Sequence, residues 1–143
     1  MKILIICSTS FYDRIKDIEK VLVSKGHTVK MPNCYDAPVT NEDNKKMSEE
    51  EYKEFFARMY QESREGVSSV DAVLVLNYTK IKNGQAYDNY IGASTFLEMY
   101  EAFMNNKKIY LYNGLPDKDH MLYEEIKGFA PIIINQDLTK IEK

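Results

Sequence analysis

Asp71-Ala72-Val73-Leu74-Val75-Leu76-Asn77 decides the fold, because its five central residues are all apolar and mostly branched. An uninterrupted run of this kind is typical of a strand buried on both faces of a parallel sheet. Lys2-Ile3-Leu4-Ile5-Ile6-Cys7 shows the same pattern near the N-terminus. The two runs therefore predict two central strands of one parallel sheet.

Helical and shorter strand patterns fill much of the remaining sequence. A first helix is expected where apolar residues recur at helical spacing over 15–22, before Gly26, and a second where residues 48–51 have capping-box spacing. Further helices are expected over 91–105 and 121–127, and further strands over 27–31, 108–112 and 131–134. The polar segments 32–46 and 78–89 are expected to be loops.

The alternation of strands and helices predicts right-handed strand–helix–strand units. We expect an α/β fold in which a five-stranded parallel sheet of order 2-1-3-4-5 forms the middle layer of a three-layer sandwich. The order follows from placing the two most apolar strands, the first and the third, at the centre. One domain is expected to span residues 1–143.

The composition narrows the range of functions. Lys and Arg number 19 and Asp and Glu 22, which gives a formal charge of −3 without a basic block, so no nucleic acid polymer is expected as a partner. No apolar run approaches the roughly 18 residues of a membrane span, and the first apolar run lacks the flanks of a signal peptide. We expect a cytoplasmic protein without a membrane partner.

The cysteines and histidines do not suggest a bound metal. Cys7 and Cys34 are far apart in the sequence, and the two histidines are not spaced as metal ligands. We expect reduced thiols, no metal and no cofactor.

Three loops should carry the chemistry, because ligands bind beyond the carboxyl ends of parallel strands: residues 7–11, 77–92 and 112–119. In the first, three hydroxyl residues, Ser8, Thr9 and Ser10, precede a helix whose N-terminus suits an anion, although simple helix capping would explain them as well. The loop lacks the Gly-rich dinucleotide fingerprint and the Walker lysine. A large NAD site and an NTPase are therefore disfavoured.

The second loop leads into a helix that contains Glu98. This glutamate lies among Phe96, Leu97, Met99 and Tyr100 in the first turns of a helix that starts at the carboxyl edge of the sheet. That position would hold its carboxylate in a cleft. An ordinary surface glutamate is the alternative interpretation.

Several segments, in order along the chain, resemble the nucleoside 2-deoxyribosyltransferase superfamily. They are the first strand with its Ser-rich turn, Val70 to Asn77, Tyr90-Ile91-Gly92 with Thr95 and Leu97-Glu98-Met99, Lys108 to Leu111, and Ile132-Ile133. The superfamily includes the transferases and the deoxynucleoside 5′-monophosphate N-glycosidases of nucleotide metabolism. The resemblance covers nearly the whole chain and implies a flavodoxin-like, Rossmann-like fold and cleavage or transfer at an N-glycosidic bond.

The resemblance also implies a mechanism. In the superfamily a glutamate that opens a helix attacks the anomeric carbon of the sugar, and Glu98 matches it. The base leaves through an oxocarbenium-like state, and water or a second base resolves the glycosyl-enzyme. The leaving base needs a proton. Asp88, the nearest acid upstream, is the candidate donor, with a solvated loop aspartate as the alternative.

The substrate is expected to be a small nucleoside or nucleoside 5′-monophosphate. The residues expected to contact it are Cys7, Ser8, Thr9, Ser10, Asn77, Tyr78, Asn89, Tyr90, Gly92 and Ser94.

Three positions depart from the pattern of the superfamily. The transferases carry a first-strand tyrosine whose hydroxyl steadies the nucleophile, and Ile5 stands at the matching position, so Tyr78 or Tyr90 would have to substitute. Many members place an aspartate six residues before the glutamate and a glycine two residues after it. This chain has Gly92 and Tyr100 there.

Two other functions fit parts of the sequence. Cys7 to Asp13 and Lys25 to Val29 are similar to the opening of TIR-like NAD glycohydrolases, which also use a helical glutamate. A catalytically inactive nucleotide-binding or sensing module would keep the pocket, and it fits the missing first-strand tyrosine.

A homodimer or larger homo-oligomer is expected. Enzymes of the superfamily complete their sites across a subunit boundary. The second helix offers a broad apolar face for such contacts, made of Phe55, Phe56, Met59 and Tyr60.

Overall fold

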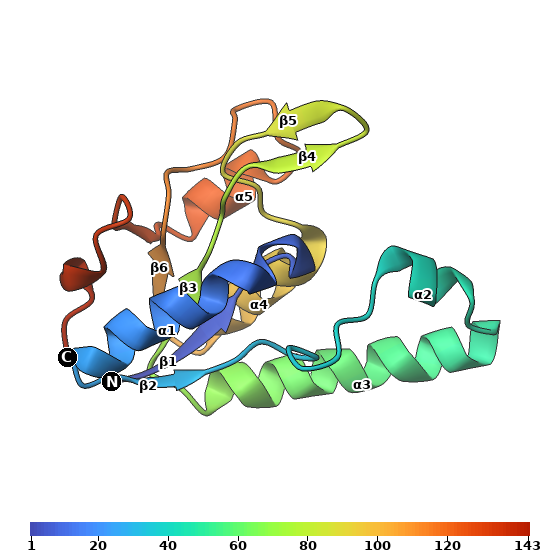
Figure 1. The fold of residues 1–143 in the computed structure, drawn as a ribbon, viewed down its shortest axis with the longest axis horizontal. Coiled ribbons are helices and arrows are strands. Elements are labelled where there is room, and N and C mark those ends of the chain that lie inside the picture. Colours follow the sequence, from blue (N-terminus) through green and yellow to red (C-terminus); the bar gives the residue numbers. More distant parts are fainter.

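The computed structural model describes residues 1–143 and contains a five-stranded parallel sheet of order β2-β1-β3-β6-β7 (Figure 1). The strands are β1 (Lys2–Ile6), β2 (Thr28–Lys30), β3 (Ala72–Val75), β6 (Lys108–Leu111) and β7 (Ile132–Ile133). Neighbouring strands pair in parallel throughout. Because β6 and β7 are the fourth and fifth strands expected from the sequence, the predicted order and the α/β class are confirmed.

Helices cover both faces of the sheet. They are the 3-10 helix η1 (Thr9–Arg14), α1 (Ile15–Ser24), α2 (Asn41–Lys45), α3 (Glu49–Ser68), α4 (Ala93–Met104), α5 (Tyr123–Gly128) and the 3-10 helix η2 (Leu138–Lys140). On one face, Ile3 and Ile5 of β1 pack with α1 and the C-terminal segment. On the other face, Leu4 and Ile6 pack with α3, α4 and α5. The result is the three-layer arrangement expected from the sequence.

The central strands are buried on both faces, as their continuous apolar runs predict. Every residue of β3 is fully buried, and Ile3 to Ile6 of β1 are at most 2% exposed. No helix has both the length and the apolar composition needed to cross a membrane.

The segment 78–89, expected to be a loop, contains an antiparallel hairpin of β4 (Lys80–Lys82) and β5 (Gln85–Tyr87). Asn83 and Gly84 form its turn with φ of 52° and 75°, the left-handed conformation that an Asn-Gly pair adopts in a tight hairpin. Its strands are short and largely exposed, so they lack the apolar alternation that identifies a half-buried strand.

Two further differences concern helices. The segment 32–46, also expected to be a loop, contains α2, which Thr40 and Asp43 cap reciprocally. The expected turn at residues 8–10 continues into η1, with Ser8 as its N-cap. The capping box predicted at Ser48 and Glu51 is present at the start of α3.

The N-terminal half of α3 and the short α2 extend beyond the sheet (Figure 1). Four aromatic side chains form a connected cluster along this part of α3: Phe56 lies 4.7 Å from Tyr52, 5.3 Å from Phe55 and 5.8 Å from Tyr60, measured between ring centroids. Tyr52 and Tyr60 are each about half exposed. The predicted apolar face of this helix is therefore only partly covered by the chain itself.

Candidate active site

Glu98 lies in the second turn of α4, which begins after Gly92 at the carboxyl edge of the sheet. Its side chain is partly exposed, but its carboxyl group is closely surrounded by protein. Burial raises the pKa of this carboxyl group to about 7, and the nearby Ser63 hydroxyl opposes the rise. The carboxylate is therefore about half ionised near neutral pH, where it can act as a nucleophile or exchange a proton.

Cys7 and Tyr12 are close enough to Glu98 for its charge to affect them. Burial raises the pKa of the Cys7 thiol to about 12, and the negative charges of Glu98 and Asp13 add to the effect. Burial, with Cys7 and Glu98 as additional causes, also raises the pKa of the Tyr12 hydroxyl. The Cys7 thiol and the Tyr12 hydroxyl are consequently neutral at the pH at which Glu98 titrates. Of these three side chains, Glu98 is the one that carries charge.

A short hydrogen-bond network joins α3 to the loop after β2 beside Glu98. The Asn33 side-chain amide donates to Ser63 Oγ at 2.9 Å and to the Met59 carbonyl at 3.4 Å. The Tyr12 hydroxyl donates to the Asn33 carbonyl at 3.0 Å. These bonds connect η1, the loop after β2 and α3.

A second cluster, at the ends of β1 and β3, combines cations with aromatic rings. Lys80 Nζ lies 3.4 Å from Ser8 Oγ and 4.8 Å from the centre of the Tyr90 ring. Burial and the neighbouring Lys82 lower the pKa of the Lys80 ammonium group. The Arg14 guanidinium lies 4.4 Å from the centre of the Tyr78 ring.

No acidic side chain forms an ion pair with Lys80 or Arg14. Lys80 is also partly buried, so its charge is less well solvated than that of a surface lysine. The cluster thus presents positive charge to the carboxyl edge of the sheet without a protein anion to neutralise it.

Several predicted site residues hold the loops in place. Asn77 is fully buried, donates to the Gly114 carbonyl at 2.8 Å and accepts from the Asn113 backbone N–H at 2.8 Å. Asn89 adopts a φ of 53° and donates to the Leu115 carbonyl at 3.0 Å. Their side chains therefore connect the second and third loops.

The other predicted residues differ in their placement. Asp88 is exposed, accepts a hydrogen bond from Thr79 at 2.8 Å, and is not joined to Glu98 by a hydrogen bond or ion pair. Gly92 is the N-cap of α4, and Ser94 is exposed in its first turn. Ser8 Oγ accepts from the Ser10 N–H at 3.3 Å, which is the helix-capping role that was the alternative to an anion site.

Tyr12 is a tyrosine whose pKa the charge of Glu98 helps to raise. Tyr78 instead packs against Phe11 and Tyr112, with ring centroids 5.5 and 5.3 Å away, and Tyr90 stacks with Lys80. Tyr12 could have been noticed, because the first loop was already a candidate and η1 follows it directly. Ser63 and Asn33 carry no sequence signal, since their roles depend on how α3 packs against α4.

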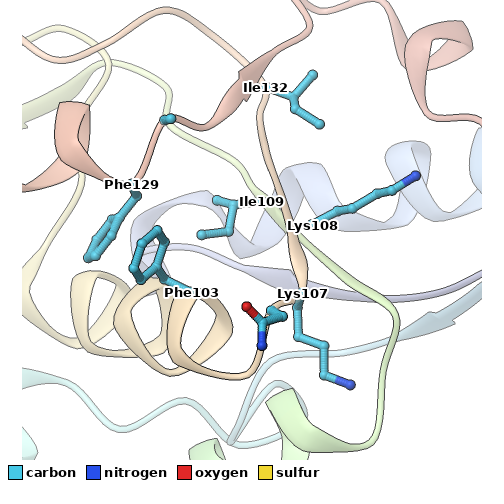
Figure 2. Close-up of a pocket in the computed structure, with 8 residues that line it drawn as sticks. Phe103, Lys107, Lys108, Ile109, Phe129 and Ile132 are labelled. Carbon is cyan, nitrogen blue, oxygen red and sulfur yellow. The ribbon is translucent and has the colours of Figure 1, made fainter.

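Two hollows of the chain surface are not lined by Glu98. A cavity of about 330 Å³ is lined by residues that include Phe103, Lys108, Phe129 and Ile132 (Figure 2), at the amino end of β6. An apolar groove of about 540 Å³ runs between α4 and α5. Neither is lined by Glu98, Ser8 or Lys80. Because the chemistry lies at the opposite edge of the sheet, we place the candidate site there.

No cluster of His, Cys, Asp and Glu side chains suited to a metal ion is present.

No family model and no curated protein matches the sequence. Among solved structures, the chain is similar to the 2-deoxyribosyltransferase of the psychrotolerant bacterium Bacillus psychrosaccharolyticus, with a TM-score of 0.50 and 19% identity over 77% of this chain and 70% of that one. It is also similar to the Clostridium botulinum CMP N-glycosidase BcmB, with a TM-score of 0.52 and 15% identity over 94% of this chain and 90% of that one.

These similarities show a common fold. The two neighbours are a deoxyribosyltransferase and an N-glycosidase, the two kinds of enzyme that the sequence resemblance indicated. The resemblance is therefore confirmed at the level of the fold.

Proposed function

We propose that this protein is an enzyme that cleaves, or transfers at, the N-glycosidic bond of a nucleoside or nucleoside 5′-monophosphate, with Glu98 as the nucleophile. The observation that carries the proposal is the partly buried Glu98 carboxyl group at the carboxyl edge of the sheet, with a pKa of about 7. Its fold, shared with a deoxyribosyltransferase and a CMP N-glycosidase, supports the same reaction class.

In the proposed reaction, a Glu98 carboxylate oxygen forms a bond to C1′ while the bond between C1′ and the base nitrogen breaks. The electron pair of that bond leaves with the base, which takes up a proton, and the sugar is left as an ester of Glu98. Water or a second base then attacks C1′ and restores the carboxylate. Asp88 is the proposed proton donor to the leaving base, and its carboxyl group, which accepts a hydrogen bond from Thr79, is exposed to solvent next to the hairpin.

The cationic cluster favours a nucleotide over a nucleoside. Lys80 and Arg14 have no acidic partner, and Lys80 already lies within hydrogen-bond distance of the Ser8 hydroxyl. A 5′-phosphate would provide the missing negative charge and could accept hydrogen bonds from both side chains. Ser8 directly follows Cys7, and the negative charge of Glu98 contributes to the raised pKa of the Cys7 thiol. One nucleotide could therefore contact both Ser8 and Glu98.

The test is release of free base, followed by chromatography, from a panel of deoxynucleosides, deoxynucleoside 5′-monophosphates and NAD. Base release from a deoxynucleotide that disappears in Glu98→Gln supports the proposal. Added free base of another kind separates the two outcomes, because a transferase forms a new nucleotide and a hydrolase does not. Release only from NAD would favour a TIR-like glycohydrolase. Nucleotide binding without any release would identify an inactive binding module.

A further inference from the structure

The β4–β5 hairpin has two chemically different faces. Side chains alternate between the two sides of a strand, and residues paired directly across two strands lie on the same side. The pairs of this hairpin are Lys80 with Tyr87, Ile81 with Ala86, and Lys82 with Gln85. One face therefore carries Ile81 and Ala86. The other, which we call the inner face, carries Lys80, Lys82, Gln85 and Tyr87.

The inner face is turned towards the candidate site. Lys80 Nζ lies 3.4 Å from Ser8 Oγ, which follows the end of β1. The centre of the Tyr87 ring lies 6.4 Å from that of Tyr90, which precedes α4 by two residues. The hairpin projects beyond the end of β3 (Figure 1). Lys82, nearer the tip, therefore continues the face that begins with Lys80 at the site.

The inner face offers hydrogen-bond donors and no negative charge. Neither Lys80 nor Lys82 forms an ion pair. The Tyr87 hydroxyl donates to Gln85 Oε1 at 3.3 Å, so the amide protons of Gln85 remain available. Asp88, the acid that follows the hairpin, accepts a hydrogen bond from Thr79 at 2.8 Å. This combination of groups suits an anionic ligand.

The two lysines differ in what they can reach. Lys80 is partly buried beside Ser8, whereas Lys82 is exposed and lies two residues, roughly 7 Å, further along the strand. A single phosphate held by Ser8 and Lys80 leaves Lys82 without a partner. A second phosphate linked to the first and directed along the inner face would come within reach of the flexible Lys82 side chain.

We propose that the inner face extends the phosphate site, with Lys82 as a specificity-determining residue that binds a second phosphate. The ligand class of the site then includes deoxynucleoside 5′-diphosphates. The inference rests on the proposed function, because it takes the first phosphate to lie at Ser8 and Lys80.

The test compares the affinity for a deoxynucleoside 5′-diphosphate with that for the monophosphate of the same base, for each of the four common bases, by titration calorimetry. Glu98→Gln serves as the parent protein, because it cannot form the glycosyl ester and leaves the ligand intact. The parent should bind the diphosphate about tenfold more tightly, through the added charge-assisted hydrogen bond. Lys82→Gln should remove this preference without changing monophosphate affinity, and Lys82→Arg should keep it.

The matched control moves the positive charge to the other face of the hairpin. Ile81→Lys combined with Lys82→Gln keeps the net charge of the hairpin, but the new ammonium group lies on the side of Ala86. The diphosphate preference should therefore stay lost. Its return in this double variant, or equal affinity of the parent protein for both phosphates, would overturn the inference.

Binding and base release are separate measurements, so the two proposals can fail separately. Diphosphate preference in the parent protein, without base release by the unmodified protein from any nucleotide, would contradict the proposed function and support this inference. Base release without a diphosphate preference would contradict this inference alone. The absence of any nucleotide binding would overturn both.

Discussion

Lys80 Nζ lies 3.4 Å from Ser8 Oγ, and this contact joins the β4–β5 hairpin to the carboxyl end of β1. The hairpin is otherwise mostly exposed, and Ile81 at its centre is 67% exposed. Lys80, at the base of the hairpin, is partly buried and loses hydration that no acidic side chain replaces. The contact therefore directs the ammonium group of Lys80, the partly buried lysine of the hairpin, towards the candidate site.

Lys80→Gln should raise KM for a deoxynucleoside 5′-monophosphate about tenfold while changing KM for the matching deoxynucleoside little, because the lost charge would contact only the phosphate. Lys82→Gln is the matched control, since Lys82 has the same charge on the same hairpin but is exposed. Equal changes for both substrates in Lys80→Gln would reject a phosphate role for this residue.

Glu98→Gln should reduce base release by about 10³-fold or more, because an amide cannot form the glycosyl ester. The size and shape of the side chain are kept. The measurement is the rate of base release from the best substrate of the panel, with Glu54→Gln, an exposed glutamate without an ion pair, as the control. A Glu98→Gln enzyme as fast as the unmodified protein would remove this residue from the mechanism.

The rate of base release should rise with pH through about 7, because only the ionised Glu98 can attack C1′ and its pKa is about 7. The limb should appear in kcat/KM, which reports groups of the free enzyme. A profile that is flat between pH 6 and 8 would contradict a nucleophile with this pKa.

Protein stability should change with pH in the opposite direction. The folded-state pKa of about 7 exceeds the ordinary value of 4.5, so between these pH values the folded protein holds a proton that the unfolded chain has released. The free energy of unfolding should therefore fall as pH rises through this window, by up to about 3 kcal/mol from this group. Urea unfolding should show Glu98→Gln gaining stability over the unmodified protein at pH 8 but not at pH 4.5.

Light scattering at tens of micromolar should give the mass of a homodimer or larger assembly. The aromatic cluster on the part of α3 that extends beyond the sheet is the contact we expect, since Tyr52 and Tyr60 expose large apolar rings there. Tyr60→Glu should then shift the protein towards the monomer, whereas Glu54→Gln on the same helix should not. A monomeric mass for the unmodified protein would contradict the prediction.

The sheet was predictable because its strands are buried on both faces and thus appear as continuous apolar runs, such as Ala72 to Leu76. The hairpin was not, because its strands pair only with each other and Ile81 remains exposed. Its Asn83-Gly84 turn was visible in the sequence, but without apolar flanks it indicated only a loop.

Part of the site followed from similar reasoning. Glu98 was identifiable from its position near the start of a helix at the carboxyl edge, and Ser8 from the first loop. Ser63 and Lys80 were not, because their importance depends on which segments the fold brings together: α3 against α4, and the hairpin against the end of β1. Asn77 and Asn89 lay in the expected loops, but their amides are occupied by neighbouring carbonyls.

Because the pKa of Glu98 is about 7, ligand binding can be coupled to the uptake of protons from the buffer. A nucleotide that brings a doubly charged phosphate near this carboxyl group would make its ionised form less favourable, so the complex would take up protons from solution. The calorimetric binding enthalpy at pH 7 would then differ between phosphate and Tris buffers, whose ionisation enthalpies differ, while a neutral nucleoside would show a smaller difference. Proton uptake would thus distinguish charged from uncharged ligands without any turnover.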